Sequence, residues 1–267
     1  MDFINANYKV YLERMTNSFN VTSKGNIPKW CDPKGRTLDV GCGSGVLLET
    51  LPNAVGIDLN PSAVQACLNR GLNAKCVALE DIDETFDTIV FSSVLHEFSS
   101  YADENRFSDI PIMKALSAAH SKLNANGQII IRDGIEEPKY RATLIAKNKA
   151  IREALFRYQD EAPMFKHTPI EIRVSGNVIN APSNFLKEFM FTYTWGPESY
   201  PREVNEKYGI LTVDNWIRCV KSANFEVQYL KTYEEEYVKY LSEYFEVTAD
   251  LKKIFKNSTI FIVATKK

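Results

Sequence analysis

The chain has 267 residues, of which 45% are hydrophobic, and it carries 32 basic and 34 acidic side chains. This length and composition fit one large globular domain or a domain with an insertion. The formal charge of −2 excludes a protein that binds nucleic acid through a strongly basic surface overall. The five cysteines include no C-x-x-C pair, so the sequence signals neither a disulfide framework nor a zinc cluster.

The N-terminal stretch MDFINANYKVYLERM lacks the basic start and apolar centre of a signal peptide. No apolar run reaches the roughly 18 residues that a membrane helix needs. We therefore expect a soluble, cytoplasmic protein with reduced thiols and no membrane partner. We also expect a first helix, with Tyr8, Tyr11 and Arg14, to close over a bound ligand as a lid.

Strand-like and helix-like segments alternate from residue 36 to residue 134. Between them the stretches PSAVQACLNRG and DIPIMKALSAAHSKLNANG carry apolar residues at helical spacing, and the second is expected to end at Asn126 and Gly127. Strict alternation of this kind predicts an α/β fold with a doubly wound, mostly parallel sheet. The expected strands are the short apolar runs at 37–41, 54–60, 74–80, 87–95 and 127–134.

The alternation stops after residue 134 and resumes at residue 212. The interruption contains a basic stretch with a helical pattern, 139–158, and an alternating segment in which Ser175-Gly176-Asn177 predicts a turn. A helix behind a Thr212 cap and the strands FEVQYLKTY and STIFIVATKK then complete a core of about seven strands. The expected organisation is an N-terminal helical lid (1–33), a ligand-binding core (34–134), an insertion after the fifth strand that covers the substrate site (135–211), and a C-terminal completion of the core sheet (212–267).

The stretch GCGSG, residues 41–45, lies where the first strand gives way to a helix. Ligands of an open parallel sheet bind at the carboxyl ends of its strands, where a first turn offers free backbone N–H groups. Asp58 follows the second strand, where a carboxylate can accept hydrogen bonds from ribose hydroxyls. Val46 stands where a dinucleotide-binding turn has its third glycine, so the pattern G-x-G-x-G favours a different nucleoside-bearing ligand.

The segments LDVGCGSG, GIDLN and FDTIVFSSVLHEF resemble the successive motifs of class I S-adenosylmethionine-dependent methyltransferases. The closing segment NWIRCVKSANFEV is similar to the late helix and strand of that fold. The resemblance covers roughly residues 34–134 and 211–267, and it implies a Rossmann-like sheet with S-adenosyl-L-methionine as cofactor and S-adenosyl-L-homocysteine as product. It also implies an enzyme that needs no metal, since the sulfonium already supplies a good leaving group.

The resemblance assigns residues to the cofactor. Gly41, Gly43 and Gly45 lie against the methionine part, with Asp39 fixing the loop through its carboxylate, and Asp58 binds the ribose. Ala78 and Leu79 stand where the family commonly has an acidic residue followed by a small one, so an adenine contact from Glu80 or Asp81 departs from the family pattern. The expected cofactor-binding residues are Asp39, Gly41, Gly43, Gly45, Asp58, Leu59, Leu79, Glu80 and Ser92.

His96 and Glu97 follow the fourth strand, beside the expected position of the transferable methyl group. Histidine has an unperturbed pKa of about 6.5, which suits it to take a proton from an attacking oxygen or nitrogen. Glu97 could orient the imidazole or accept a hydrogen bond from the substrate. We expect both to be catalytic; the alternative is that they pack against or cap the next element.

The insertion leaves the sheet at the carboxyl end of the fifth strand, so we expect it to cover the methyl acceptor. Between residues 139 and 173 basic side chains outnumber acidic ones, which favours a small anionic acceptor methylated on oxygen or nitrogen. We assign Arg132, Tyr140 and Arg141 to substrate binding. Two alternatives stay open: an RNA methyltransferase that uses the basic insertion, and a non-catalytic cofactor-binding protein. DNA is not expected, because the fourth strand is not followed by a proline-proline-aromatic signature and no Pro-Cys dipeptide occurs.

Overall fold

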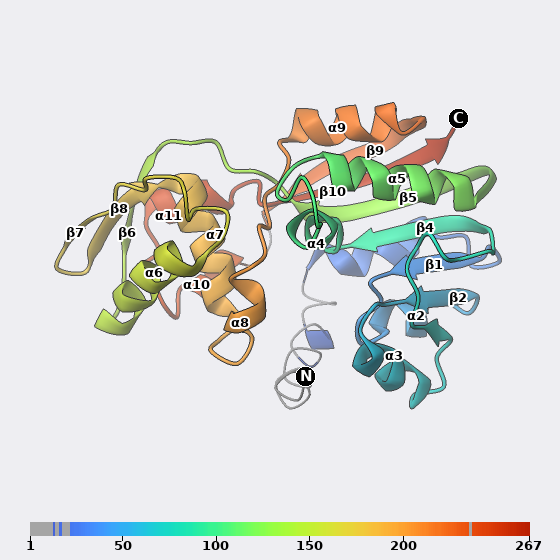
Figure 1. Ribbon diagram of the computed structural model, residues 1–267, viewed down its shortest axis with the longest axis horizontal. Helices are drawn as coiled ribbons and strands as arrows, with labels where there is room; N and C mark the ends of the chain where they lie inside the picture. The colour runs from blue at the N-terminus through green and yellow to red at the C-terminus, as the bar shows by residue number, and fades with distance from the viewer. Residues whose placement is uncertain (1–12, 14–15, 18–21, 235–236) are drawn as a thin grey trace.

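The structure is a computed structural model that describes residues 13, 16–17, 22–234 and 237–267. Figure 1 shows two lobes, one built around a seven-stranded sheet and one around a three-stranded sheet. Tyr8, Tyr11 and Arg14, which we expect to belong to a lid, lie outside the described residues.

The core sheet has the strand order β3-β2-β1-β4-β5-β10-β9. The pairs from β3 to β5 are parallel, and β10 runs antiparallel to both β5 and β9. Its strands are β1 (Thr37–Val40), β2 (Ala54–Ile57), β3 (Ala74–Lys75), β4 (Phe86–Ser92), β5 (Leu123–Gly134), β9 (Phe225–Tyr233) and β10 (Thr259–Lys266). This confirms the predicted doubly wound, mostly parallel, seven-stranded sheet with an insertion after its fifth strand.

Both faces of the core sheet are buried, because alternate residues of a strand contact helices on opposite sides. In β5, Ile129 and Ile131 pack in the cluster that contains α5 and α9, whereas Ile130 packs with η1 and α2. This arrangement explains why the strands read as continuous apolar runs in the sequence. The elements around the sheet are η1 (Ser23–Trp30), α2 (Val46–Thr50), α3 (Pro61–Leu68), α4 (Leu95–Ser100), α5 (Ile110–Lys122) and α9 (Val213–Ser222).

Helix α5 ends earlier than the sequence predicts. Its last residue is Lys122, and β5 begins at Leu123. Asn126 has a φ of 62° and lies within β5, after which the ladder with β4 continues at Gln128 in a shifted register. Asn126 and Gly127 therefore form an irregularity inside the strand. A residue with left-handed backbone angles can interrupt the hydrogen-bond ladder of a sheet, just as it can end a helix.

Helix α9 begins behind the predicted Thr212 cap. The Thr212 hydroxyl accepts a hydrogen bond from the backbone N–H of Asn215 at 3.3 Å. Trp216 and Val220 of this helix are buried, and the Trp216 indole N–H donates to the carbonyl of Gly134 at 3.1 Å. The helix thus holds the end of β5, where the chain leaves the core.

The second lobe contains an antiparallel sheet of order β6-β8-β7. The predicted turn joins β7 to β8 through Gly176 and Asn177, with a φ of 56° at Gly176. The prediction of one helix over 139–158 is wrong in its first part, because Ala142 and Leu144 alternate into the core as a strand. The elements of this lobe are β6 (Arg141–Ile145), α6 (Lys149–Glu161), β7 (Arg173–Ser175), β8 (Val178–Pro182), α7 (Ser183–Thr194), α8 (Tyr200–Glu203), α10 (Tyr237–Leu241) and α11 (Ala249–Phe255).

Helices α10 and α11 depart from the expectation that residues 212–267 only complete the core sheet. They lie between β9 and β10 in the chain, yet Leu241, Leu251 and Phe255 pack into the apolar cluster of the second lobe. Figure 1 shows both helices in that lobe, beside α7. Helix α11 packs against α7 and β6. The second lobe is therefore built from two separate chain segments.

The two lobes are joined where two connecting segments pass each other at close range. Glu136 donates its backbone N–H to the carbonyl of Leu211 at 2.8 Å. Next to this bond, a Cβ added to Gly134 would lie 2.9 Å from the carbonyl carbon of Tyr208 and closer still to its oxygen. The absence of a side chain at Gly134 is therefore what lets the segments touch.

Helix α7 binds both connecting segments. The carboxylate of Glu188 accepts hydrogen bonds from the backbone N–H groups of Tyr208 and Gly209, at 2.7 and 2.9 Å. The neighbouring Lys187 ammonium donates to the carbonyl of Ile135 at 2.9 Å and lies 3.7 Å from the carboxylate of Glu137. Both side chains are buried, so the junction is held by charge-assisted hydrogen bonds away from solvent.

We predict that Gly134→Ala destabilises the protein by about 3 kcal/mol, because the added methyl meets the backbone at Tyr208 and cannot be relieved by a rotamer change. Gly71→Ala is the matched control. Gly71 has a φ of 74° but nothing within 4 Å of an added Cβ, so only its backbone conformation is penalised, by about 1 kcal/mol. Urea unfolding measures both, and equal losses would contradict the close passage.

Candidate functional site

The glycine turn between β1 and α2 adopts left-handed backbone angles at all three glycines. Gly41, Gly43 and Gly45 have φ values of 70°, 51° and 76°. A Cβ on Gly41 would lie 2.5 Å from a methyl of Val94, and one on Gly45 would lie 2.8 Å from the sulfur of Cys67. Glycine is thus required both by backbone angle and by packing.

Asp58 ties the glycine turn to the end of β2. Its Oδ2 atom accepts a hydrogen bond from the backbone N–H of Gly43 at 3.0 Å, and its Oδ1 atom accepts one from that of Asn60 at 2.8 Å. Burial raises the pKa of Asp58, and these two N–H groups oppose the rise. Each oxygen keeps a further lone pair for a ligand hydroxyl. The next residue, Leu59, is 75% exposed, so an apolar side chain borders the same edge.

A cavity lies beneath the glycine turn, at the carboxyl ends of β1 and β4. It is small, with a volume of about 30 Å³, and is lined by Lys24, Asp39, Gly41, Cys42, Ser44, Val46, Leu47 and Ser92. The structure therefore brings three of the predicted cofactor residues, Asp39, Gly41 and Ser92, to one space. Thr16, a described residue of the N-terminal segment, donates a hydrogen bond to the Ser44 hydroxyl at the rim, at 2.9 Å.

Asp39 is buried in the wall of this cavity. Within the described part of the chain its carboxylate makes no hydrogen bond to the glycine loop, so the expected fixing of the loop falls to Asp58 instead. Burial raises the pKa of Asp39 to about 8, and the neighbouring Cys67 and Asp58 add to the rise. Asp39 is thus a buried carboxyl group whose surroundings disfavour its ionised form.

The two residues assigned to the adenine edge separate in the structure. The side chain of Leu79 is 2% exposed and packs in the core, whereas Glu80 is exposed at the surface. Leu79 can therefore meet a ligand only through its backbone, because its side chain fills the core beneath the loop.

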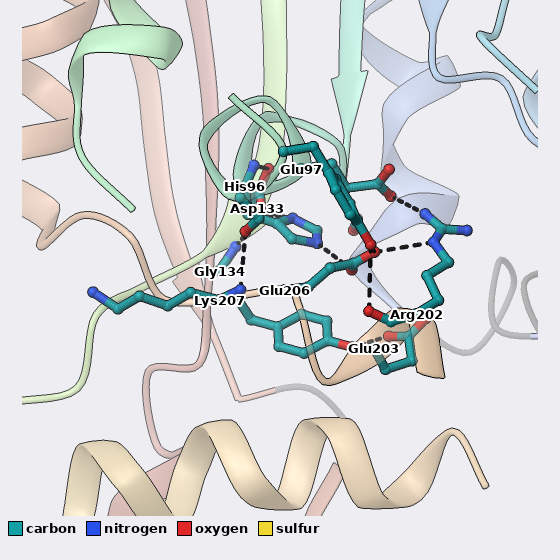
Figure 2. Close-up of polar contacts among 12 residues, drawn as sticks. His96, Glu97, Asp133, Gly134, Arg202, Glu203, Glu206 and Lys207 are labelled. Atoms are coloured by element: carbon teal, nitrogen blue, oxygen red, sulfur yellow. Dashed lines mark hydrogen bonds and ion pairs between the residues drawn. The ribbon is translucent and has the colours of Figure 1, made fainter. Parts of the chain in front are cut away.

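His96 and Glu97 lie in the first turn of helix α4, and Figure 2 shows them facing side chains of the second lobe. His96 Nδ1 lies 2.7 Å from Oδ1 of Asp133, and its backbone N–H donates to Oδ2 of the same residue at 3.2 Å. On the other side, Nε2 of His96 lies 3.5 Å from Oε2 of Glu206. The buried ring also stacks beside Tyr208, with centroids 5.1 Å apart.

These neighbours change what His96 can do. Burial alone would lower its pKa, but the carboxylates of Asp133 and Glu206 raise it well above its usual range. The imidazole in these surroundings keeps its proton at neutral pH, which conflicts with the expectation that it removes a proton from the acceptor. That expectation used the unperturbed pKa of histidine. The two carboxylates that raise the pKa are distant from His96 in the sequence, so the sequence does not reveal them.

Arg202 joins the two lobes at this point. Its terminal nitrogen lies 2.8 Å from Oε1 of Glu97, and its Nε donates to Oε1 of Glu206 at 3.0 Å. Tyr101 of the core also donates its hydroxyl to that Glu206 oxygen, at 2.8 Å. The guanidinium additionally opposes the raised pKa of Asp58. Arg202 of the insertion thus forms an ion pair with Glu97 of α4 and also affects the charge of Asp58 at the expected ribose site.

The sequence-based reasoning missed Asp133, Arg202, Glu206 and Tyr101. Asp133 could have been found, because it ends an apolar strand at the edge of the sheet where ligands bind. Arg202 and Glu206 are spaced four residues apart, as an ion pair on a helix would be, but nothing in the sequence shows that they meet α4.

The residues assigned to the substrate do not meet at the site. Arg132 is buried under η1, where it donates to the hydroxyls of Ser23 and Ser93. Tyr140 lies under the ammonium of Lys253, 3.9 Å from the ring centre, in the second lobe. Arg141 is exposed and bonds to Asn180 and Glu171 on the outer hairpin. In Figure 1, β6 lies well away from the glycine turn beside β1.

The basic side chains of the insertion pair locally on its surface. Lys149 and Arg157 face glutamates one turn along α6, and Arg173 faces Glu171. Arg152 donates to the carbonyl of Gly176 in the hairpin turn. The excess of positive charge in the sequence therefore does not gather at the carboxyl edge of the core sheet.

The described cysteines are all free thiols, and no described helix combines the length and the apolar character that crossing a bilayer requires.

Residues 20–230 match the family model described as a methyltransferase domain. No curated protein matches the sequence.

Solved structures with similar folds include S-adenosylmethionine-dependent methyltransferases from Methanosarcina mazei and Mesorhizobium loti. The first is 16% identical over 90% of this chain and 96% of its own, with a TM-score of 0.50. The second is 12% identical over 91% and 97%, with a TM-score of 0.52. A possible histamine N-methyltransferase from Thermotoga maritima is 15% identical over 96% and 94%, with a TM-score of 0.51. At these identities the structures establish the fold alone.

The buried carboxyl of Asp39 predicts a pH dependence of stability. The folded chain keeps a proton that the unfolded chain releases between roughly pH 4 and pH 8, so the free energy of unfolding should fall as pH rises through this window. The side chain of Asp39→Asn cannot titrate. Between pH 5 and pH 8 the free energy of unfolding of this variant should rise relative to that of the wild type by on the order of 2–4 kcal/mol. Urea unfolding at both pH values tests this, with the exposed Asp103→Asn as control. Parallel pH curves for Asp39→Asn and wild type would contradict it.

Proposed function

The chain belongs to the methyltransferase domain family and is an S-adenosylmethionine-dependent methyltransferase, and we propose that it methylates an oxygen or nitrogen atom of a small molecule held between its two lobes. The cavity beneath the glycine turn carries this proposal. It lies at the carboxyl ends of β1 and β4, beside the turn that Asp58 binds.

The residues around the cavity fit S-adenosylmethionine. When bound, this cofactor supplies a methyl group on a sulfonium that is already a good leaving group. We propose that Gly41, Gly43 and Gly45 admit its methionine part, with Asp39 facing positive charge and Ser92 offering backbone groups. Asp58 would accept hydrogen bonds from the ribose hydroxyls, and the exposed Leu59 would cover the base.

We propose that residues 135–211 cover the acceptor and that α4 forms the opposite wall. The support is the contact between Arg202 of the insertion and Glu97 of α4, which closes one side of this edge. Glu97 is half-buried, so it lies where an acceptor group can reach it, whereas His96 is buried and held by Asp133. Catalytic roles for both residues stay predictions. Their placement favours alignment of the acceptor over proton removal by His96.

The acceptor expected from the sequence was anionic. Lys149, Arg157 and Arg173 of the basic side chains behind that expectation pair with glutamates on the surface of the second lobe. The groups between α4 and the insertion are mainly carboxylates. These observations support an uncharged or cationic acceptor better than an anionic one. They also give no positive surface that would favour RNA over a small molecule.

Transfer of labelled methyl from S-adenosylmethionine to fractionated small-molecule extracts tests the proposal. A labelled low-mass product that forms only with the intact chain supports it. If label appears in RNA, and if RNA binding weakens steeply as the salt concentration rises, the acceptor is RNA and not a small molecule. Cofactor binding without turnover on any fraction would favour a non-catalytic cofactor-binding protein.

We predict that Asp58→Ala weakens S-adenosylmethionine binding by about 2–3 kcal/mol, because it removes charge-assisted hydrogen bonds to the ribose. Asp58→Asn keeps one acceptor oxygen and should recover part of this loss. Isothermal titration calorimetry measures both, with the exposed Asp103→Ala as control. Because Asp58 also binds the Gly43 N–H, unfolding curves must show that the variants are folded. Unchanged affinity in folded Asp58→Ala would remove Asp58 from the cofactor site.

A further inference from the structure

Three side chains from the two lobes point ligand atoms at one another. His96 and Glu97 come from α4 and Glu206 from the insertion, and one ligand atom of each lies within 4.8 Å of the others. Figure 2 shows the His96 ring and the Glu206 carboxylate facing each other across the gap between the lobes. His96 and Glu206 are buried, and Glu97 is half-buried.

The polar atoms that do not face this point already have partners. His96 Nδ1 is held by Asp133 at 2.7 Å, which leaves Nε2 for a ligand. A metal ion bound at Nε2 would take the place of the proton that the ring otherwise keeps there. Glu206 Oε1 accepts hydrogen bonds from Tyr101 and Arg202, which leaves Oε2 facing Nε2. Glu97 Oε1 is held by Arg202 in the same way. A histidine that donates its second ring nitrogen to a carboxylate is the usual arrangement at metal sites.

The distance between the facing atoms also suits an ion. Nε2 of His96 and Oε2 of Glu206 are 3.5 Å apart, which is long for a direct N–H···O hydrogen bond. Two ligand atoms each about 2.1 Å from a tetrahedral metal lie about 3.4 Å from each other. The Glu97 carboxylate, whose side chain is 26% exposed, lies within 4.8 Å of both atoms.

A fourth carboxyl group, that of Glu203, lies beside the cluster of His96, Glu97 and Glu206 and has one oxygen without a hydrogen-bond partner among the described residues. Glu203 is 1% exposed, and its Oε1 atom has no hydrogen-bond partner among the described residues, while Tyr208 binds its other oxygen. Its interactions with Glu206 and Glu97 place it next to the cluster. Four carboxylates, those of Glu97, Asp133, Glu203 and Glu206, therefore share one guanidinium and one imidazole. A cation bound beside Glu203 would give its Oε1 atom a partner that the described residues do not supply.

We propose that His96, Glu97 and Glu206 bind a divalent first-row transition metal ion such as Zn²⁺, with Asp133, Tyr101 and Arg202 orienting the ligands. A nitrogen and carboxylate donor set suits this class of ion. The site departs from the expectation that the enzyme needs no metal. It spans both lobes, so the ion would hold the insertion against α4. Metal binding here does not depend on which acceptor the enzyme uses.

Metal content and metal affinity of the whole chain test the proposal without any measurement of methyl transfer. Protein produced without an affinity tag or chelator is analysed by mass spectrometry for bound metals, then stripped and titrated with Zn²⁺ by calorimetry. We expect one ion per chain, bound with a dissociation constant of about 1 μM or tighter. Wild type that binds Zn²⁺ only above about 1 mM would overturn the proposal and leave the cluster as an ion-pair network.

Variants locate the ion. His96→Asn and Glu206→Gln should each weaken Zn²⁺ binding at least about 100-fold, because each removes a direct ligand. His167→Asn, at an exposed position outside the cluster, should leave it unchanged. Equal affinity in the two cluster variants and wild type would overturn the assignment. If a cluster variant does not fold, the visible spectrum of wild type with Co²⁺ decides instead: nitrogen and oxygen ligation gives d–d bands of a protein-bound ion, and a spectrum identical to aqueous Co²⁺ would refute the site.

Discussion

The close passage of the two connecting segments determines how the second lobe is oriented relative to the core sheet. Gly134 lies against the backbone of Tyr208, and α7 binds both segments through Lys187 and Glu188. These contacts leave no side chain between the segments, so the insertion approaches the carboxyl edge of the sheet in one orientation. That orientation brings Arg202 and Glu206 against α4. The contacts between α4 and the insertion therefore depend on this junction.

The site is built from charges that one lobe could not bury alone. Glu206 lies at 1% exposure and needs Tyr101 and His96 from the core as well as Arg202 from its own lobe. Desolvation of such groups is tolerated only when each is paired. The same pairing connects the acceptor side to the cofactor side, because Arg202 acts on both Glu97 and Asp58. Formation of the polar cluster and docking of the insertion are therefore one event.

The sequence was sufficient for the core and for the glycine turn because both depend on local patterns. Gly41, Gly43 and Gly45 and the carboxylate of Asp58 lie at fixed offsets from strands whose apolar runs are unmistakable. The insertion was harder: a basic helical pattern concealed β6, and charge counting placed Arg141 at the substrate although the side chain bonds to the outer hairpin. The expectation that His96 acts as a base rested on its unperturbed pKa, whereas Asp133 and Glu206, distant in the chain, determine its surroundings. Pairings of this kind depend on how two lobes dock, which no local pattern encodes.

The division of the second lobe between two chain segments has a consequence for folding. Its apolar core is incomplete until α10 and α11 are available, and the core sheet is incomplete until β10 pairs between β5 and β9. On a ribosome, the second lobe can therefore not finish before α11 has emerged, nor the core sheet before β10, although β1 to β5 are made first. The chain then closes both lobes together, and thermal unfolding should be a single cooperative transition in which a defect in either core weakens the whole protein.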